Sequence, residues 1–143
     1  MTPIFKDWKT ARRGFLFGQK YPASFGSLAG KPHLGLDIIE PSGTWGVAWQ
    51  DLDVIKYSYG QEGGNTILIK CPNNPRLFRL MHLLHSVKTG HYKEGSKLFQ
   101  VGNTGSASSG SHLHLDISKN GILNITNFYN FEDPAVYFAS IFK

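Results

Sequence analysis

The chain has 143 residues, the usual size of one domain, and 41% of them are apolar, enough to bury a core. The charged fraction of 17% excludes an intrinsically disordered chain, and the single cysteine, Cys71, excludes an intramolecular disulfide. The net charge of +5 favours a polyanionic partner, but the basic residues are scattered, so we expect no nucleic-acid tract. No apolar run is long enough for a signal peptide or a membrane span, so we expect no membrane insertion.

The first 24 residues show no clear periodicity and form an N-terminal extension of unclear structure. The 16 glycines spread along the chain leave room for short strands and little room for long helices. Alternating or β-branched runs predict strands at 33–39, 52–59, 65–71, 77–84, 96–102 and 112–118. The sequence therefore predicts a single, mainly β domain over residues 1–143, built on an antiparallel sheet.

Only the tail 132–143 is predicted to be helical. Asp133 is a suitable N-cap residue, and Pro134 suits the first helical turn. The spacing predicts one buried helix face, formed by Val136, Ala139 and Ile141.

The strand predicted at 33–39 carries two groups that can bind a metal. Side chains alternate between the two faces of a strand, so His33, Gly35 and Asp37 share one face. The other face carries leucine and isoleucine. A helix would also bring His33 and Asp37 together, but the flanking proline, glycine and isoleucines favour the strand.

The strand predicted at 112–118 repeats this arrangement. His112, His114 and Asp116 share one face, and leucine and isoleucine occupy the other. Catalytic zinc usually has three protein ligands of nitrogen and oxygen type and one open position, and two histidines with one carboxylate would supply them. The competing explanation is that these histidines occupy solvated strand faces, and the spacing alone leaves both explanations open.

Three segments of the chain form an ordered set, which comprises HLGLD at 33–37, LMHLL at 80–84 and GNTGSASSGSHLHLDI at 102–117. Together they resemble the signatures of the lysostaphin-type, LytM-like zinc endopeptidases that cut bacterial cell walls. The resemblance continues weakly to 133–134, so the matching core is about 25–134. It implies an antiparallel β-sheet with loops that form the walls of a groove and a short C-terminal helix.

The resemblance also implies roles for five side chains. It makes His33, Asp37 and His114 the protein ligands of one Zn²⁺ ion. It makes His82 and His112 catalytic residues, which handle the activated water and the developing oxyanion. An imidazole suits both tasks because its pKa lies near neutral pH.

The loop before the last predicted strand is rich in small polar residues. Its candidate substrate-binding residues are Asn103, Thr104 and Ser108, although the simpler explanation is that they only form turns. Asp116 either supports the histidine ligands or is a plain edge carboxylate.

Two tryptophans and two histidines are further candidates for the groove and the site. Trp45 and Trp49 either line the groove or are buried against the sheet, as most tryptophans are. His85 is expected to have a structural or turn role, and His91 is expected in a solvated turn.

The expected function is zinc-dependent hydrolysis of peptide bonds in bacterial peptidoglycan, in a cross-bridge or a stem peptide. Peptidoglycan is then the partner, no nucleic acid is bound, and the enzyme acts on the bacterial cell wall. The missing signal peptide points to a bacteriophage-type enzyme, carried on the virion or released from the host cytoplasm at lysis. The alternatives are an inactive wall-binding scaffold or hydrolase activator of the same fold, and a basic nucleic-acid-binding β-barrel.

Overall fold

The computed structural model describes residues 1–142, so Lys143, the end of the predicted helical tail, lies outside the described residues. The strands are β1 (Gly35–Ile39), β2 (Trp45–Val47), β3 (Leu52–Gly60), β4 (Gly64–Lys70), β5 (Leu77–Leu83), β6 (Gly90–Tyr92), β7 (Lys97–Gln100), β8 (His112–Ser118) and β9 (Phe131–Glu132). The helices are η1 (Ala23–Leu28) and η2 (Phe128–Asn130), both of 3₁₀ type, and α1 (Pro134–Ile141). The prediction of a mainly β fold with a short C-terminal helix is confirmed.

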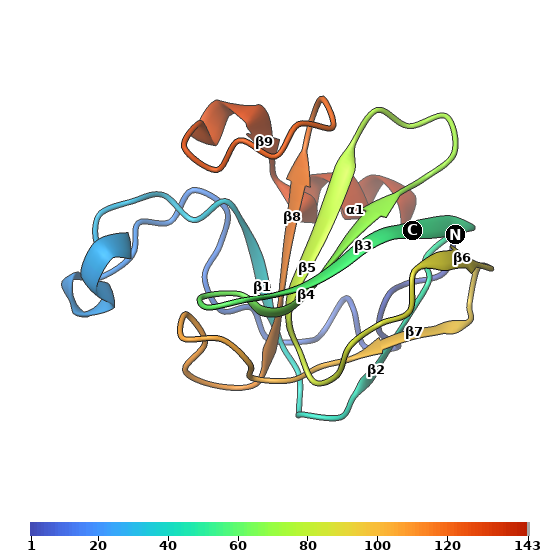
Figure 1. Ribbon diagram of the computed structural model, residues 1–143, viewed down its shortest axis with the longest axis horizontal. Helices are drawn as coiled ribbons and strands as arrows, with labels where there is room; N and C mark the ends of the chain where they lie inside the picture. Colours follow the sequence, from blue (N-terminus) through green and yellow to red (C-terminus); the bar gives the residue numbers. More distant parts are fainter. Residues whose placement is uncertain (143) are drawn as a thin grey trace.

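One antiparallel sheet dominates the molecule (Figure 1). Its strands run in the order β1-β8-β5-β4-β3-β6, and β9 adds a short pairing to β8. β2 and β7 form a separate two-stranded sheet. The order places β8 between β1 and β5, although these three strands are far apart in the sequence.

The hydrophobic core lies against one face of this sheet. Leucines and isoleucines of β1 and β8 are at most 1% exposed there, as the alternation predicts, and they are Leu36, Ile38, Leu113, Leu115 and Ile117. Aromatic side chains from β5 and α1 complete the core around Trp49, which lies 5.1 Å from Phe78 and 5.4 Å from Phe138 between ring centroids. Trp49 is therefore buried and does not line the groove, which is one of the two positions expected for it.

Helix α1 covers this core with a face that includes only Ile141 of the three residues predicted to be buried. Asp133 caps the helix by accepting a hydrogen bond from the Ala135 amide, as expected. The prediction that Val136 is buried is wrong, because its side chain is 70% exposed, and Ala139 is exposed as well. The buried residues are Pro134 and Phe138 of the helix and Phe142 directly after it, each four residues from the next. Burial of two large rings outweighs burial of smaller aliphatic side chains.

The segment before η1 contributes to the core and completes the edge of the sheet. Ile4, Phe5 and Trp8 are at most 5% exposed. Backbone bonds join residues 12–19 to β1 and its approach, including Gly14 N to Asp37 O at 2.9 Å and Asp37 N to Phe15 O at 3.0 Å. These bonds satisfy backbone groups on the outer edge of β1. No helix within residues 1–142 has the length and apolar character to cross a membrane.

Candidate metal and catalytic site

The register of β8 with its two neighbours assembles the site. Asp37 of β1 lies opposite His114 of β8, and Met81 of β5 lies opposite His114 on the other side. His112 is 8% exposed and His114 is 7% exposed, so the explanation by solvated strand faces is wrong for both. Both strands therefore direct their polar side chains into a buried space above the sheet.

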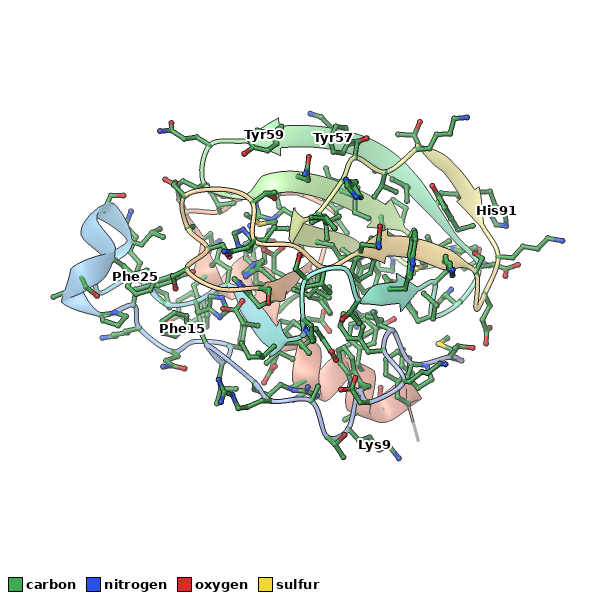
Figure 2. The ribbon with its side chains drawn as sticks, turned by 90° about the horizontal axis from the view of Figure 1, so that it is seen from below. Lys9, Phe15, Phe25, Tyr57, Tyr59 and His91 are labelled. Atoms are coloured by element: carbon green, nitrogen blue, oxygen red, sulfur yellow. The ribbon has the colours of Figure 1, made fainter. Side chains whose placement is uncertain are left out.

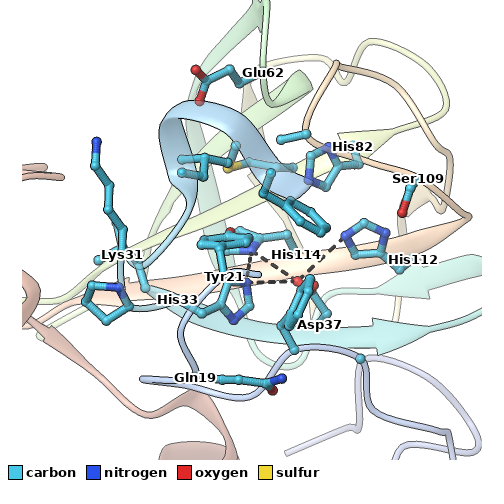
Figure 3. Close-up of a pocket in the computed structure, with 18 of the residues that line it drawn as sticks. Gln19, Tyr21, Lys31, His33, Asp37, Glu62, His82, Ser109, His112 and His114 are labelled. Atoms are coloured by element: carbon cyan, nitrogen blue, oxygen red, sulfur yellow. Dashed lines mark hydrogen bonds and ion pairs between the residues drawn. The ribbon is translucent and has the colours of Figure 1, made fainter. Parts of the chain in front are cut away.

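The three predicted ligands converge on one point (Figure 3). His33 Nε2 lies 3.2 Å from Asp37 Oδ1, and His114 Nδ1 lies 3.1 Å from the same oxygen. His33 Nε2 and His114 Nδ1 are 3.1 Å apart. Bonds of about 2.0–2.1 Å to a tetrahedral ion place donor atoms about 3.3 Å from one another, so these separations suit zinc. The donor set and its spacing therefore fit a single divalent cation.

Acceptors on the far side of each imidazole fix which nitrogen faces this point. His33 Nδ1 donates to Leu16 O at 3.2 Å, and His114 Nε2 donates to Asp116 Oδ2 at 2.8 Å. Arg79 holds Asp116 in turn through two nitrogens, with Nη2 to Oδ2 at 2.7 Å and Nε to Oδ2 at 3.0 Å. Such contacts orient metal-binding histidines. Asp116 is fully buried, so it supports His114 and is not an edge carboxylate.

The charges of the cluster are strongly coupled. Burial alone would raise the pKa of Asp37, but hydrogen bonds from His114 and His33 outweigh it and lower that pKa well below its ordinary value. Burial would lower the pKa of His114, but Asp116 and Asp37 raise it to about 9. Burial would raise the pKa of Asp116, but Arg79 and His114 together outweigh it and lower that pKa. The cluster thus keeps two carboxylates ionised in a buried site, which favours a bound cation.

The two predicted catalytic histidines lie side by side next to this cluster. Their ring centroids are 4.7 Å apart. His82 Nδ1 donates to Thr104 O, and His112 Nδ1 donates to Gly110 O, both at 2.8 Å. His112 Nε2 lies 3.6 Å from Asp37 Oδ1. Burial lowers the pKa of His82 to about 4, so this imidazole is neutral at physiological pH.

All five side chains line one groove of about 960 Å³. One wall is an aromatic cluster that the sequence did not reveal, made of Phe15, Tyr21 and Phe25, whose ring centroids are 5.3–5.4 Å apart. Phe15 and Phe25 lie at the η1 end of the molecule (Figure 2). Tyr21 also packs edge-on against His33 at 5.6 Å, and burial raises its pKa to about 12. These residues precede the recognised signatures and follow no period, so no sequence signal pointed to them.

The loop before β8 forms another wall through Ser109, Gly110 and Ser111. The three predicted substrate contacts of this loop bind within the protein. Ser108 Oγ lies 2.5 Å from Asn103 Oδ1, and Thr104 Oγ1 donates to Leu83 O at 2.8 Å. Their contact with substrate stays a prediction.

The remaining singled-out residues lie away from the site. Trp45 is 44% exposed and lies under the Lys97 ammonium, and it is not among the residues that line the groove. His85 follows β5 in an exposed bend, as expected. His91 lies in β6 instead of a turn, where its Nδ1 is 3.1 Å from Asp53 Oδ1.

The fold and the site together define a class of protein, an antiparallel β-sheet protein with a candidate metal site of two histidines and one aspartate on and beside two adjacent strands. Residues 31–124 match the model of peptidase family M23, and the chain belongs to this family. The predicted resemblance to lysostaphin-type peptidases is thereby confirmed.

Solved structures agree with this assignment. LytU is 28% identical, with 91% of this chain and 86% of that chain covered and a TM-score of 0.73. A zinc-containing peptidase from Vibrio cholerae is 26% identical, with 81% of this chain and 35% of that one covered and a TM-score of 0.66. The catalytic domain of the antimicrobial peptidase lysostaphin from Staphylococcus simulans shares the fold at 22% identity, with coverages of 92% and 94% and a TM-score of 0.74.

Proposed function

We propose that this protein is a zinc-dependent endopeptidase that hydrolyses peptide bonds of bacterial peptidoglycan, in a cross-bridge or a stem peptide. The observation that carries the proposal is the convergence of His33, Asp37 and His114 in a groove that also holds His82 and His112. Membership of family M23 and the likeness to LytU and lysostaphin support a peptide substrate from the bacterial wall.

In this proposal His33 Nε2, Asp37 Oδ1 and His114 Nδ1 hold the ion. When bound, zinc supplies a Lewis acid that polarises a peptide carbonyl and acidifies a water molecule. Leu16 O and Asp116 accept from the far nitrogens of the two imidazoles, so each ring turns its near nitrogen toward the ion. The ionised Asp37 offsets part of the charge of the ion.

His82 and His112 serve the reaction from beside the ion. Each ring is tied by its Nδ1–H to a backbone carbonyl, which leaves Nε2 of the neutral ring as an acceptor. An imidazole so placed takes a proton from the attacking water or, once protonated, donates to the developing oxyanion. The proton taken from the water then passes to the amine that leaves as the C–N bond breaks, so the pair accounts for both proton transfers that amide hydrolysis needs, and no covalent intermediate is required.

Delivery of the enzyme to the wall is a separate part of the proposal. The net charge of +5 favours adsorption to an anionic wall polymer. A bacteriophage source, with the enzyme on a virion or released at lysis, stays a prediction.

The test is digestion of purified cell walls of several peptide compositions, with mass spectrometry of the released muropeptides. We expect new peptide termini, their loss after chelation, and their return with added zinc. His112→Ala should retain zinc and lose about 10²–10⁴-fold in rate, the usual contribution of a general acid or base.

Two outcomes would contradict the proposal. A protein that binds zinc and walls but releases no peptide termini would be a wall-binding scaffold. Salt-sensitive retention of DNA or RNA that ignores chelators, without wall cleavage, would indicate a nucleic-acid-binding protein.

A further inference from the structure

The end of β5 departs from regular strand alternation at His82. Phe78 and Leu80 are fully buried in the core, while Arg79 and Met81 line the groove on the other face. Regular alternation would place His82 in the core, beside Leu80. Instead His82 lines the groove, so two successive residues face the same side.

An extra residue in β5 causes His82 to face the groove. Ile67 of β4 pairs with Leu80, and Asn65 pairs with Leu83, so β5 has one residue more than β4 between these pairs. The bulge returns Leu83 to the core at 0% exposure. The φ angle of His82 is 66°, in the left-handed region, which costs a residue other than glycine about 1–2 kcal/mol. A bulge that redirects a side chain at this cost needs contacts that hold it in place.

Two side chains hold the backbone that follows His82. The Leu83 carbonyl accepts a hydrogen bond from Asn65 Nδ2 at 2.9 Å and another from Thr104 Oγ1 at 2.8 Å. Asn65 is only 8% exposed, and its Oδ1 accepts from the hydroxyl of Tyr57 on β3 at 2.5 Å. Tyr57 lies on β3, the strand on the side of the molecule away from α1 (Figure 2). The carbonyl is therefore held by two buried or half-buried donors at once.

Thr104 also holds the imidazole itself. Its backbone carbonyl accepts the Nδ1–H of His82 at 2.8 Å, while its hydroxyl accepts from the backbone N–H of Asn65 at 3.1 Å. Gly64 permits this approach, since a Cβ there would lie 2.3 Å from Thr104 Oγ1. One residue of the loop before β8 thus fixes both the ring of His82 and the backbone after it.

We propose that Asn65 and Thr104 are positioning residues, which hold the bulge of β5 so that Nε2 of His82 faces the groove. We name the two residues and their bonds to Leu83 O the His82 clamp. Its consequence for catalysis rests on the proposed function, but its consequence for the tautomer and mobility of His82 does not. The clamp also gives Thr104 a role other than contact with substrate.

The first test removes the hydroxyl of Thr104 alone. Thr104→Val keeps the shape of the side chain and the carbonyl that binds His82, but it removes one anchor of Leu83 O. We expect kcat for wall peptides to fall about 10–100-fold with KM within about twofold and full zinc content, because small misplacement of a reacting group costs about that much. Thr104→Ser, which retains the hydroxyl, should restore most of the rate.

The matched control is Ser118→Ala. Ser118 is fully buried, and its hydroxyl donates to Ile122 O at 2.6 Å, so the substitution also removes a bond to a backbone carbonyl. It should lower the melting temperature to a similar extent and leave kcat unchanged. An equal loss of kcat in both variants, or none in Thr104→Val, would overturn the proposal.

A double-mutant cycle tests whether Thr104 acts through His82. In a His82→Ala background, Thr104→Val should have no further effect on kcat, because the group that it positions is gone. A loss of kcat by the same factor in both backgrounds would overturn the assignment.

Nuclear magnetic resonance of the ring nitrogens tests the clamp without any activity. In the parent chain we expect His82 as a single Nδ1–H tautomer with a slowly exchanging ring proton. In Asn65→Ala and Thr104→Val the tautomers should mix and the proton should exchange faster. An unchanged tautomer and exchange rate would overturn the clamp, whereas an inactive parent with the expected spectrum would overturn only the proposed function.

Discussion

The site rests on two regions of the sheet that are built in opposite ways. β8 is regular, is paired on both sides, and has all seven residues buried, so its alternation alone directs His112, His114 and Asp116 to one face. The end of β5 is irregular, and His82 reaches the same groove only through a bulge with a left-handed backbone. Two of the three proposed metal ligands, Asp37 and His114, thus depend on the ladder of the sheet, whereas one proposed catalytic histidine depends on a few side-chain bonds.

This difference predicts that metal binding and catalysis can be separated by mutation. His114→Ala should lose most of the bound zinc, because it removes one of three donors. His82→Ala should keep the metal and lose cleavage, because its ring belongs to the bulge and not to the donor set. Metal analysis of the two purified variants beside the parent is the measurement. Equal zinc content in His114→Ala and the parent would contradict the ligand assignment.

The support of His114 gives the next largest expected effect. Arg79→Met leaves the buried Asp116 without its guanidinium partner, so the hold on His114 Nε2 should weaken and zinc affinity should fall about 10–100-fold. Competition with a chelator measures the affinity. Arg76→Met is the matched control, since Arg76 pairs with the partly exposed Glu132 at 2.9 Å and should leave zinc affinity unchanged. A similar loss in both variants would show that the effect does not pass through Asp116.

The two regions should also differ in their response to pH in the metal-free protein. The pKa of His114 is raised to about 9 against burial by Asp116 and Asp37, so its stabilisation is complete below about 6.5 and is lost as the pH rises through 9. Burial lowers the pKa of His82 to about 4, so its contribution is complete above about 6.5 and is lost as the pH falls toward 4. Ring-proton shifts measured against pH should resolve the two titrations, and a common midpoint near 6.5 would remove the contrast.

The smallest expected effect tests the bulge through stability. At His82, with φ of 66°, glycine should give a more stable protein than alanine by about 1 kcal/mol, because glycine adopts this conformation without cost. At His112, in the regular strand, glycine should be less stable than alanine by about 0.5–1 kcal/mol. Denaturant unfolding of the four variants measures the free energies. The same order at both positions would mean that His82 carries no backbone strain.

Much of the fold could be predicted from the sequence, because regular strands leave a period of two, whereas the choice of His33, Asp37 and His114 as the donor set came from the resemblance to the family. That period placed His112 and His114 on one face and their leucine neighbours in the core. It could not place His82, because a bulge leaves no period, and only the resemblance of LMHLL to a family signature assigned that residue. Asp116 was identified as a candidate, but its partner Arg79 lies on a strand that is distant in sequence.

Other features depended on tertiary packing. The buried face of α1 follows the fit of Phe138 against Trp8 and Trp49, each at 5.4 Å between ring centroids, and the spacing of aliphatic residues did not reveal it. The segment before η1 carries no period because it pairs with the edge of β1 through irregular backbone bonds. The aromatic wall of the groove, with Tyr21, came from this segment and was therefore missed.

The most direct test of the central claim is the position of zinc in crystals of the metal-loaded protein, located by anomalous diffraction at the zinc edge. We expect one peak about 2.0–2.2 Å from His33 Nε2, an Asp37 oxygen and His114 Nδ1. A peak bound by other side chains, or a loaded protein with no peak between these three donors, would contradict it.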